Sequence, residues 1–350
     1  MGRNAKGMRY LPFPQWPQVD NAAWSDAIAQ GDILDGRGPA AHWSPAYRHT
    51  SRIHYSRWLA YLADCGIALD GSLPEDRLTR EATEGYVEQL RARVAPRTMV
   101  SAMVGLKVMM KAMAPHRDWR WLGDVCNALN RNARPTRDKL ARMRPSDEIY
   151  AAALGALDDL GAPPFRHRRQ RVAWRDSLML ALMAARPLRI KNFAGLTLGR
   201  SFVRTGQGWL IAVPGEEIKN GMPLEYNVPT SLVPYLEIYL QEIRPAFLLG
   251  AEHNALWLTF AGKPMAMQTI HCCIIQTTTA LLGVPINPHL LRDCAATMLS
   301  SLSPEAALAT SALLGHRSFA TTERYYIRAN QLDAGRKVSA VLLALKKEPE

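Results

Sequence analysis

Apolar residues recur at helical spacing along most of this chain and alternate at strand spacing in one stretch. One helical stripe in the front part consists of Tyr55, Trp58, Leu59 and Leu62. Residues 201–229 contain the runs WLIAV and LEYNV on either side of a turn, which is the pattern of a β-hairpin. Helical patterns return after it, up to about residue 346. The sequence therefore predicts a mainly α fold with a small antiparallel β-sheet.

The front part divides into an arm and a helical domain. Residues 1–45 are rich in Pro, Trp, Gly and Asp without clear periodicity, so we expect an irregular arm that could include one short helix. Residues 46–130 carry several amphipathic stripes, one of which consists of Met99, Met103, Leu106, Met110 and Met113. A methionine stripe at helical spacing is typical of a buried core. We expect a small helical bundle over 46–130.

A basic segment over 131–145 separates this bundle from the rest of the chain. Its one acid is Asp138, and its six cations are Arg131, Arg134, Arg137, Lys139, Arg142 and Arg144. A run of like charge is often a solvated surface, but a cationic strap between two domains is well placed to lie along phosphates. We expect an interdomain linker whose cations contact a nucleic-acid backbone. A mixed α+β domain over 146–350 then ends in an amphipathic helix, over about 332–346.

The charge balance indicates a polyanionic partner. Lys and Arg number 43 against 31 Asp and Glu, a formal net charge of +12, although an acidic protein or a membrane surface would also fit. The apolar run 178–185 is far shorter than the roughly 20 residues of a bilayer span. The start MGRNAKGMRY has no apolar core, so a secretory signal is not indicated. Five cysteines without a C-x-x-C pair favour free thiols in the cytoplasm and no zinc site.

The spacing H-x-x-R occurs three times, at His49/Arg52, His54/Arg57 and His289/Arg292. The spacing alone does not show which of the three pairs is functional. The first two pairs lie at the entry of a helix in the front part. The third follows an Asn-Pro helix start in NPHLLRDCAATML. At spacing i and i+3, His289 and Arg292 share one face of that helix.

Further polar residues surround the third pair in a defined order. Arg189 follows an apolar helix in AARPLRIKNFAGL, and Lys219 lies in the predicted hairpin. In SALLGHRSFATTERYYIRA, His316 lies in a bend nine residues before Tyr325. This order of Arg, Lys, His-x-x-Arg, His and Tyr resembles the phage integrase or tyrosine recombinase family over about residues 147–330. The front bundle resembles the core-binding domain of that family more loosely.

The resemblance implies a site-specific recombinase that cuts and rejoins double-stranded DNA through a 3′-phosphotyrosyl intermediate. The implied catalytic residues are Arg189, Lys219, His289, Arg292, His316 and Tyr325. Cations suit this chemistry because a phenol with a pKa of about 10 is a weak nucleophile and a phosphodiester is an anion. No metal or cofactor is implied. The implied assembly is a homo-oligomer on DNA, with four protomers in the synapse, and accessory proteins are left open.

Several alternatives stay open. Tyr326 is a second candidate nucleophile, and Lys191 and Lys263 compete with Lys219. Asn192 stands where the family commonly has an acid, and Asp293 where it often has a histidine, which affects how the two arginines are oriented. The other functions considered are a type IB topoisomerase, a DNA-binding protein that has lost catalysis, and a cationic protein-binding scaffold. The C-terminal helix packs either on its own domain or on a neighbouring protomer.

Overall fold

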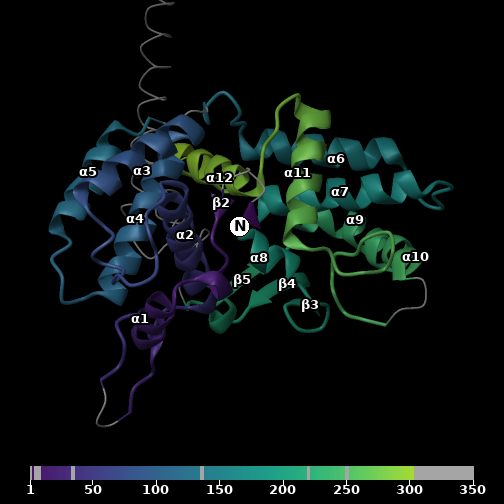
Figure 1. Cartoon of the computed structure of the whole chain (residues 1–350). Helices are drawn as coiled ribbons and strands as arrows, with labels where there is room; N and C mark the ends of the chain where they lie inside the picture. The colour runs from purple at the N-terminus through teal and green to yellow at the C-terminus, as the bar shows by residue number, and fades with distance from the viewer. Residues whose placement is uncertain are drawn as a thin grey trace, which may run out of the picture. The chain divides into compact units, whose positions relative to one another are not determined.

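The computed structural model describes residues 2–3, 9–32, 36–134, 138–218, 221–248 and 252–302 of the chain (Figure 1). The chain divides into two compact units, Met1–Asp138 and Lys139–Glu350. Each unit has a hydrophobic core of its own. Among the helices in these ranges, none is long and apolar enough to cross a bilayer.

The first unit is helical. Its elements are the two-residue strands β1 (Gly2–Arg3) and β2 (Arg9–Tyr10) and the helices α1 (Gln18–Ile28), α2 (Pro45–Asp64), α3 (Arg80–Arg93), α4 (Pro96–Met113) and α5 (Arg120–Asn132). Local chemistry sets two of the helix starts. The hydroxyl of Ser44 accepts the Tyr47 N–H at 3.3 Å before α2, and the hydroxyl of Thr79 accepts the Ala82 N–H at 3.1 Å before α3. Such caps satisfy backbone donors that have no partner within the helix.

Both apolar stripes predicted in this unit are confirmed as core. The aromatic stripe lies on α2 and the methionine stripe on α4, and no side chain of either stripe is more than 8% exposed. Both belong to one cluster of buried residues. Trp16 and Trp24, which lie in the segment expected to be an irregular arm, belong to the same cluster.

A buried carboxylate connects α1 to the rest of the first unit. Asp20 is fully buried. One of its oxygens accepts the Tyr55 hydroxyl at 2.5 Å, and the other accepts a guanidinium N–H of Arg77 at 2.6 Å. Arg77 is itself buried. The two charges therefore neutralise each other out of contact with water.

We expect Asp20→Ala to lower the free energy of unfolding of the first unit by about 3–5 kcal/mol, because it leaves the buried Arg77 guanidinium uncompensated. Urea denaturation followed by tryptophan fluorescence measures this loss. The matched control is Asp64→Ala, which removes the surface partner of Arg9 and is expected to cost less than about 1 kcal/mol. Equal losses in the two variants would contradict the importance of the buried pair.

The His54/Arg57 pair is packed inside the first unit. His54 lies on α2 opposite Gly105 of α4, where an added Cβ would come within 2.3 Å of the imidazole. Burial, with a contribution from Arg57, lowers the pKa of His54 to about 4. The imidazole is therefore neutral near pH 7, which is typical of a histidine that serves in packing.

This pKa predicts how stability depends on pH. The folded pKa of His54 lies below the ordinary 6.5, so the unfolded chain binds a proton in this range more readily than the folded one. The associated stability is present above about pH 6.5 and is lost as the pH falls towards 4, by up to about 3 kcal/mol. In urea denaturation between these pH values, His54→Gln should show a shallower decline than wild type. A decline of unchanged steepness would contradict this assignment, and His49→Gln, which replaces an exposed imidazole on the same helix, serves as the control.

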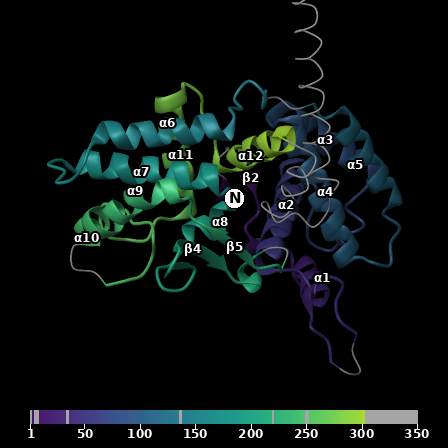
Figure 2. The same ribbon diagram turned by 180° about the vertical axis from the view of Figure 1, so that it is seen from behind.

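The second unit combines helices with one small sheet. Its helices are α6 (Ser146–Leu160), α7 (Arg168–Ala185), α8 (Ile190–Ala194), α9 (Val233–Ile238), α10 (Arg244–Leu248), α11 (Met267–Leu282) and α12 (Pro288–Leu302). A π-helical turn at Tyr239–Ile243 joins α9 to α10. Helices α6 and α7 lie side by side, and both α11 and α12 contact this pair (Figures 1 and 2).

The sheet has the antiparallel order β3–β4–β5, with strands Phe202–Thr205, Gly208–Val213 and Leu224–Asn227. Ile211 in the central strand pairs with Phe202 on one side and Tyr226 on the other. The predicted hairpin is thus confirmed, and β3 adds a third strand. The fold class is confirmed as mainly helical with a small antiparallel sheet. The helical patterns expected after residue 302, which include the amphipathic helix over about 332–346, lie outside the described residues.

Candidate active site

Arg189 stands where the long helix α7 gives way to the short helix α8. Pro187 prevents α7 from continuing, because proline has no N–H and restricts the residue before it. Leu188 is buried at 1% exposure and anchors the turn. Arg189 is then the first residue before α8, and its carbonyl accepts the Phe193 N–H at 3.0 Å. The sequence thus places Arg189 in a fixed turn between two buried side chains, Leu188 and Phe193.

Arg292 lies on α12, which begins with a capped Asn-Pro pair as expected. The side-chain oxygen of Asn287 accepts the Leu290 N–H at 2.9 Å, and Pro288 occupies the first helical position, where its missing N–H has no cost. Leu290 and Leu291 enter the core of the unit. Arg292 is only 8% exposed, and its guanidinium donates to the carbonyl of Pro187. This hydrogen bond joins α12 to the turn that precedes Arg189.

Two residues that the sequence did not single out complete the cluster. Tyr226 on β5 is half-buried, and burial raises its pKa, while the guanidiniums of Arg292, Arg186 and Arg189 act to lower it. All three arginines therefore lie within electrostatic reach of one tyrosine. Arg186 also donates to the Asn227 carbonyl at 2.9 Å, which holds β5 at the end of α7. The signal for Arg186 was its position one residue before Pro187; for Tyr226 no sequence signal was available.

The cluster has the charge that a phosphodiester requires. Three guanidiniums act electrostatically on Tyr226 at the junction of α7, α8, α12 and β5, and a guanidinium can donate forked hydrogen bonds to anionic oxygens. His289 is exposed on the first turn of α12, three residues before Arg292. Such a site can hold an anion and stabilise added negative charge on it.

The structure brings together only part of the predicted catalytic set. Arg189 and Arg292 both act to lower the pKa of Tyr226. Arg292 is bound to the carbonyl of Pro187, two residues before Arg189, and His289 lies on the same helix as Arg292. Lys219, which follows β4 in the sequence, and His316, Tyr325 and Tyr326 lie outside the described residues. Their assignment stays a prediction.

The two competing lysines lie in different parts of the unit. Lys191 is exposed on α8, two residues after Arg189. Lys263 is exposed in the turn after Thr259, whose N–H donates to the Lys263 carbonyl. Lys191 is therefore the nearer of the two, along the chain, to the arginine cluster.

Asn192 is buried beside the cluster, one turn after Arg189. Only 8% of the residue is exposed. It lies on α8 next to Phe193, which is fully buried in the core. The departure from the family pattern at this position is therefore a buried amide, which carries no charge to attract a guanidinium.

Asp293, the other departure from the family pattern, forms an ion pair with the linker. Its side chain is 4% exposed, and its carboxylate pairs with the ammonium of Lys139. Nearby, Arg142 donates to the Pro285 carbonyl at 3.3 Å. The end of the basic segment is thus attached to both sides of the α12 start.

The other described cations of the segment differ in environment. Arg131 and Arg134 are exposed, whereas Arg144 donates to the carbonyls of Ala141 and Met143 at 3.2 and 2.9 Å. Arg137 lies outside the described residues. The segment therefore contains exposed guanidiniums as well as cations that already have protein partners.

The ion pair leads to a prediction about stability. We expect Lys139→Met to lower the free energy of unfolding of the second unit by about 1–2 kcal/mol, because the buried Asp293 carboxylate loses a cation whose own side chain is half-exposed. Arg144→Met, which breaks only local backbone contacts, should change it by less than about 0.5 kcal/mol. Urea denaturation of both variants measures the difference.

A double-mutant cycle isolates the pair. Combining Lys139→Met with Asp293→Asn should cost less than the sum of the two single changes, by about 1 kcal/mol. Strict additivity would show that the two residues do not stabilise each other.

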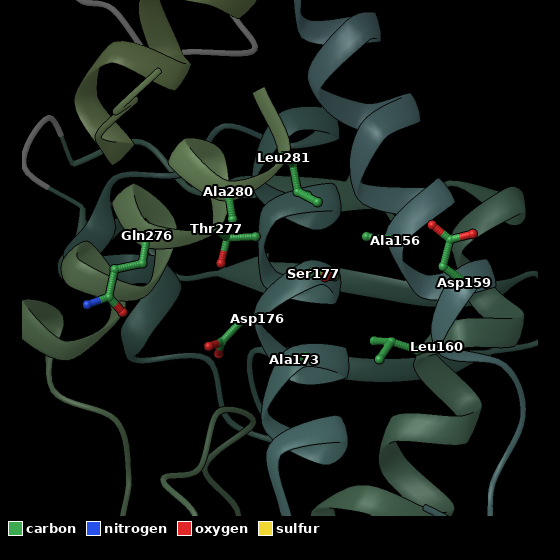
Figure 3. A pocket seen from close by; sticks show the side chains of 10 residues that line it. All are labelled: Ala156, Asp159, Leu160, Ala173, Asp176, Ser177, Gln276, Thr277, Ala280 and Leu281. Atoms are coloured by element: carbon green, nitrogen blue, oxygen red, sulfur yellow. The ribbon is translucent and has the colours of Figure 1, made fainter. Parts of the chain in front are cut away.

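A separate hollow of about 410 Å³ lies between α6, α7 and α11 (Figure 3). Its lining includes Asp159 and Asp176 among alanine and leucine side chains, and no lysine or arginine. Burial raises the pKa of Asp176, whose carboxylate is bound by Arg175 at 2.6 Å. This lining offers no cation to a phosphate, so the arginine cluster is the better candidate for an anionic substrate. Within the described ranges, no group of three His, Cys, Asp or Glu side chains is arranged to hold a metal ion.

The family model and the similar proteins point to the same family. Residues 165–332 match the model described as the phage integrase family. A tyrosine recombinase XerD from Pseudomonas aeruginosa is 32% identical over 153 residues, which are 43% of this chain and 49% of that protein. A XerD from Chlorobaculum tepidum is 25% identical over 271 residues, covering 77% and 81%. A XerD from Staphylococcus saprophyticus is 30% identical over 155 residues, covering 43% and 50%. Two of these three alignments thus span about half of the relative.

Solved structures share the fold. The post-cleavage complex of XerH site-specific recombinase with palindromic difH substrate superposes with a TM-score of 0.58 at 14% identity, covering 83% of this chain and 79% of that one. The pre-cleavage complex with difH gives a TM-score of 0.56 at 14% identity, covering 79% and 76%. At this identity the likeness establishes the architecture of the chain.

Proposed function

The chain belongs to the tyrosine recombinase family, with residues 165–332 as its phage integrase domain, and from this membership we propose that it is a site-specific DNA recombinase. It cuts and rejoins double-stranded DNA through a 3′-phosphotyrosyl intermediate and needs no metal. The observation that supports this proposal is the hydrogen bond from Arg292 to the Pro187 carbonyl, which attaches α12 to the turn that carries Arg189, together with the electrostatic effect of both arginines on Tyr226.

The arginines account for the first requirement of the reaction. A phosphodiester carries a negative charge that repels an incoming nucleophile, and the pentacoordinate transition state carries more charge still. The guanidiniums of Arg189 and Arg292 bind the two non-bridging oxygens and stabilise that charge. A donor of this kind typically contributes about 3–4 kcal/mol. Arg186 adds positive potential to the same place.

The nucleophile Tyr325, the acid Lys219 and one of the two candidate bases, His316, lie outside the described ranges, whereas the other candidate base, His289, lies on α12. The phenolic oxygen of Tyr325 attacks phosphorus as its proton passes to His316 or His289. The bond to the 5′ oxygen breaks, and Lys219 donates the proton that this oxygen takes up. The products are a 3′-phosphotyrosine and a free 5′ hydroxyl. Attack by a 5′ hydroxyl on that phosphotyrosine reverses the step and rejoins the strand, so no external energy source is required.

The same chemistry sets the proposed assembly. Exchange of two duplexes needs one active tyrosine for each of four strands, hence four protomers acting on two DNA sites in sequential steps. The exposed Arg131 and Arg134, together with Arg137, lie along the DNA backbone in this proposal. Lys139, Arg142 and Arg144 contribute to the same surface, although in the structure each has a protein partner.

We expect wild type to form a covalent protein–DNA adduct, and Tyr325→Phe to form none, because the phenylalanine has no oxygen to attack phosphorus. The measurement incubates each protein with fragmented DNA of the source replicon in EDTA, denatures with detergent and separates the adduct by size. Tyr326→Phe is the matched control, since it removes the neighbouring phenol and should leave the adduct intact.

The other outcomes separate the rival functions. An adduct that persists in Tyr325→Phe and disappears in Tyr326→Phe would move the nucleophile by one residue. Salt-dependent DNA binding without any adduct would favour a DNA-binding protein of the same fold. Adducts at random positions, with relaxation of any supercoiled plasmid, would favour a type IB topoisomerase.

A further inference from the structure

A second cationic surface lies at the opposite end of α7 from Arg189. The side chains that form this basic patch are Arg166, His167, Arg168, Arg169 and Arg171. The first four are exposed, and Arg171 is half-buried, with its guanidinium donating to the Phe165 carbonyl at 3.1 Å. We propose that the basic patch binds the phosphate backbone of a duplex DNA segment outside the cleavage site. The inference rests on the proposed function only in that the chain acts on DNA.

An aromatic ring and a hollow accompany these charges. The Arg168 guanidinium lies 4.0 Å from the centre of the Phe260 ring, which is 48% exposed. Arg175 holds this region against α7 by donating to the Leu258 carbonyl at 2.7 Å. A hollow of about 370 Å³ beside the ring is lined in part by Arg168 and Arg171. A cation held over an aromatic face keeps its N–H groups directed outward, where an anion can accept them.

The charge of the basic patch is not neutralised within the described part of the second unit. No ion pair there joins a residue of the patch to a carboxylate. Of the nearest acids on either side in the sequence, Asp158 accepts the Tyr235 hydroxyl, Asp176 binds Arg175, and Asp159 lines the hollow between α6, α7 and α11 and has no ion pair with the patch. By contrast, Arg200 pairs with Glu217 and Arg204 with Glu237. The patch therefore keeps its positive potential for a partner.

The arginines of the basic patch do not stabilise the helix that carries them. The start of a helix is the positive end of its dipole, so positive side chains there are unfavourable. The helix is started by a capping box instead, in which the His167 N–H donates to the Gln170 side chain at 3.2 Å and the neutral His167 side chain accepts the Gln170 N–H. A group of side chains that opposes its own helix, and has no carboxylate partners, is better explained by binding than by folding.

The position of the basic patch indicates which DNA it meets. Arg168 and Ala185 are the two ends of α7, about 26 Å apart at 1.5 Å per residue, and Arg189 lies beyond the second end. Both views show the α6–α7 connection at the end of the second unit away from α12 (Figures 1 and 2). Along a duplex, this separation corresponds to roughly seven to eight base pairs. Phosphates at the basic patch thus belong to a flanking stretch of the same DNA or to a second duplex.

The test compares two double variants of the full-length protein that lose equal charge. Arg168→Gln with Arg169→Gln removes two patch cations, one of them stacked on Phe260. Arg200→Gln with Arg204→Gln removes two cations with carboxylate partners, and the guanidinium of Arg204 lies over Trp209. The measurement is the dissociation constant for a 60-base-pair duplex as a function of salt concentration.

We expect the patch variant to lose about two units of the log–log salt slope, since each phosphate contact contributes about 0.9. The patch variant should bind DNA more weakly than wild type, and the ratio of the two dissociation constants should increase about tenfold as the salt concentration falls from about 200 to about 50 mM. The control variant should keep the wild-type slope. The melting temperature of the patch variant should equal or exceed that of wild type, because the removed charges oppose the helix dipole.

Three results would overturn the proposal. Unchanged slopes in both variants would show that the basic patch does not contact phosphates, and equal losses would show that only total charge matters. Loss of binding to polyglutamate in the patch variant, with an unchanged DNA slope, would identify an acidic protein as the partner.

Two further arms identify the source of the phosphates and separate this proposal from the cutting reaction. A defect that vanishes on a duplex trimmed to about five base pairs on either side of the cutting site, which is shorter than the separation estimated above, indicates flanking DNA. Loss of capture of a second labelled duplex by an immobilised complex indicates DNA in trans. With saturating DNA in EDTA, the patch variant should still form the covalent adduct. Tyr325→Phe should form none and should keep the wild-type salt slope. If no protein forms an adduct, the cutting proposal fails and the slopes still decide on the patch.

Discussion

The arrangement of the second unit depends on the hydrogen bond from Arg292 to the Pro187 carbonyl. A buried guanidinium needs acceptors, since the desolvation of an unpaired charge is expensive. The turn between α7 and α8 supplies such an acceptor, because Pro187 ends α7 and leaves its carbonyl available. The contact fixes α12 against that turn, and it brings Arg292 close to Arg189 although the two are far apart in the sequence. Arg186, bound to the Asn227 carbonyl, adds the sheet to the same junction.

Helix α7 separates two cationic regions of different character. At its end, the guanidiniums of Arg186 and Arg292 are held by backbone carbonyls, which suits a site where geometry matters. At its start, arginines are exposed and without carboxylate partners among the described residues, which suits contacts that add affinity without sequence information. Between them, Arg175 and Asp176 neutralise each other inside the unit. The hydrophobic middle of α7 keeps the two regions apart.

The first unit shows why local patterns predict helices better than they predict what packs against them. The apolar stripes on α2 and α4 could be predicted from the sequence, because the helical period of 3.6 residues per turn determines which side chains share a helix face. The sequence did not predict that Asp20 binds Tyr55 and Arg77, because these residues are far apart in the chain and nothing in their spacing links them. The same limit applies to the candidate site. Proline after an apolar helix marked the turn at Arg189, but the gathering of Arg186 and Tyr226 depended on strand β5 reaching the end of α7.

The sequence by itself determined the fold class, the hairpin over 201–229, the helix start at Asn287 and the ordered set of residues that identified the family. It did so because these features are local, or depend on order along the chain. Among the three H-x-x-R pairs, only the tertiary structure showed that His54 is packed against Gly105 and that Arg292 reaches Pro187. It alone showed Asp293 paired with Lys139, and the uncompensated charge at the start of α7. Burial and ion pairing depend on which segments meet in space, and spacing along a chain does not encode that.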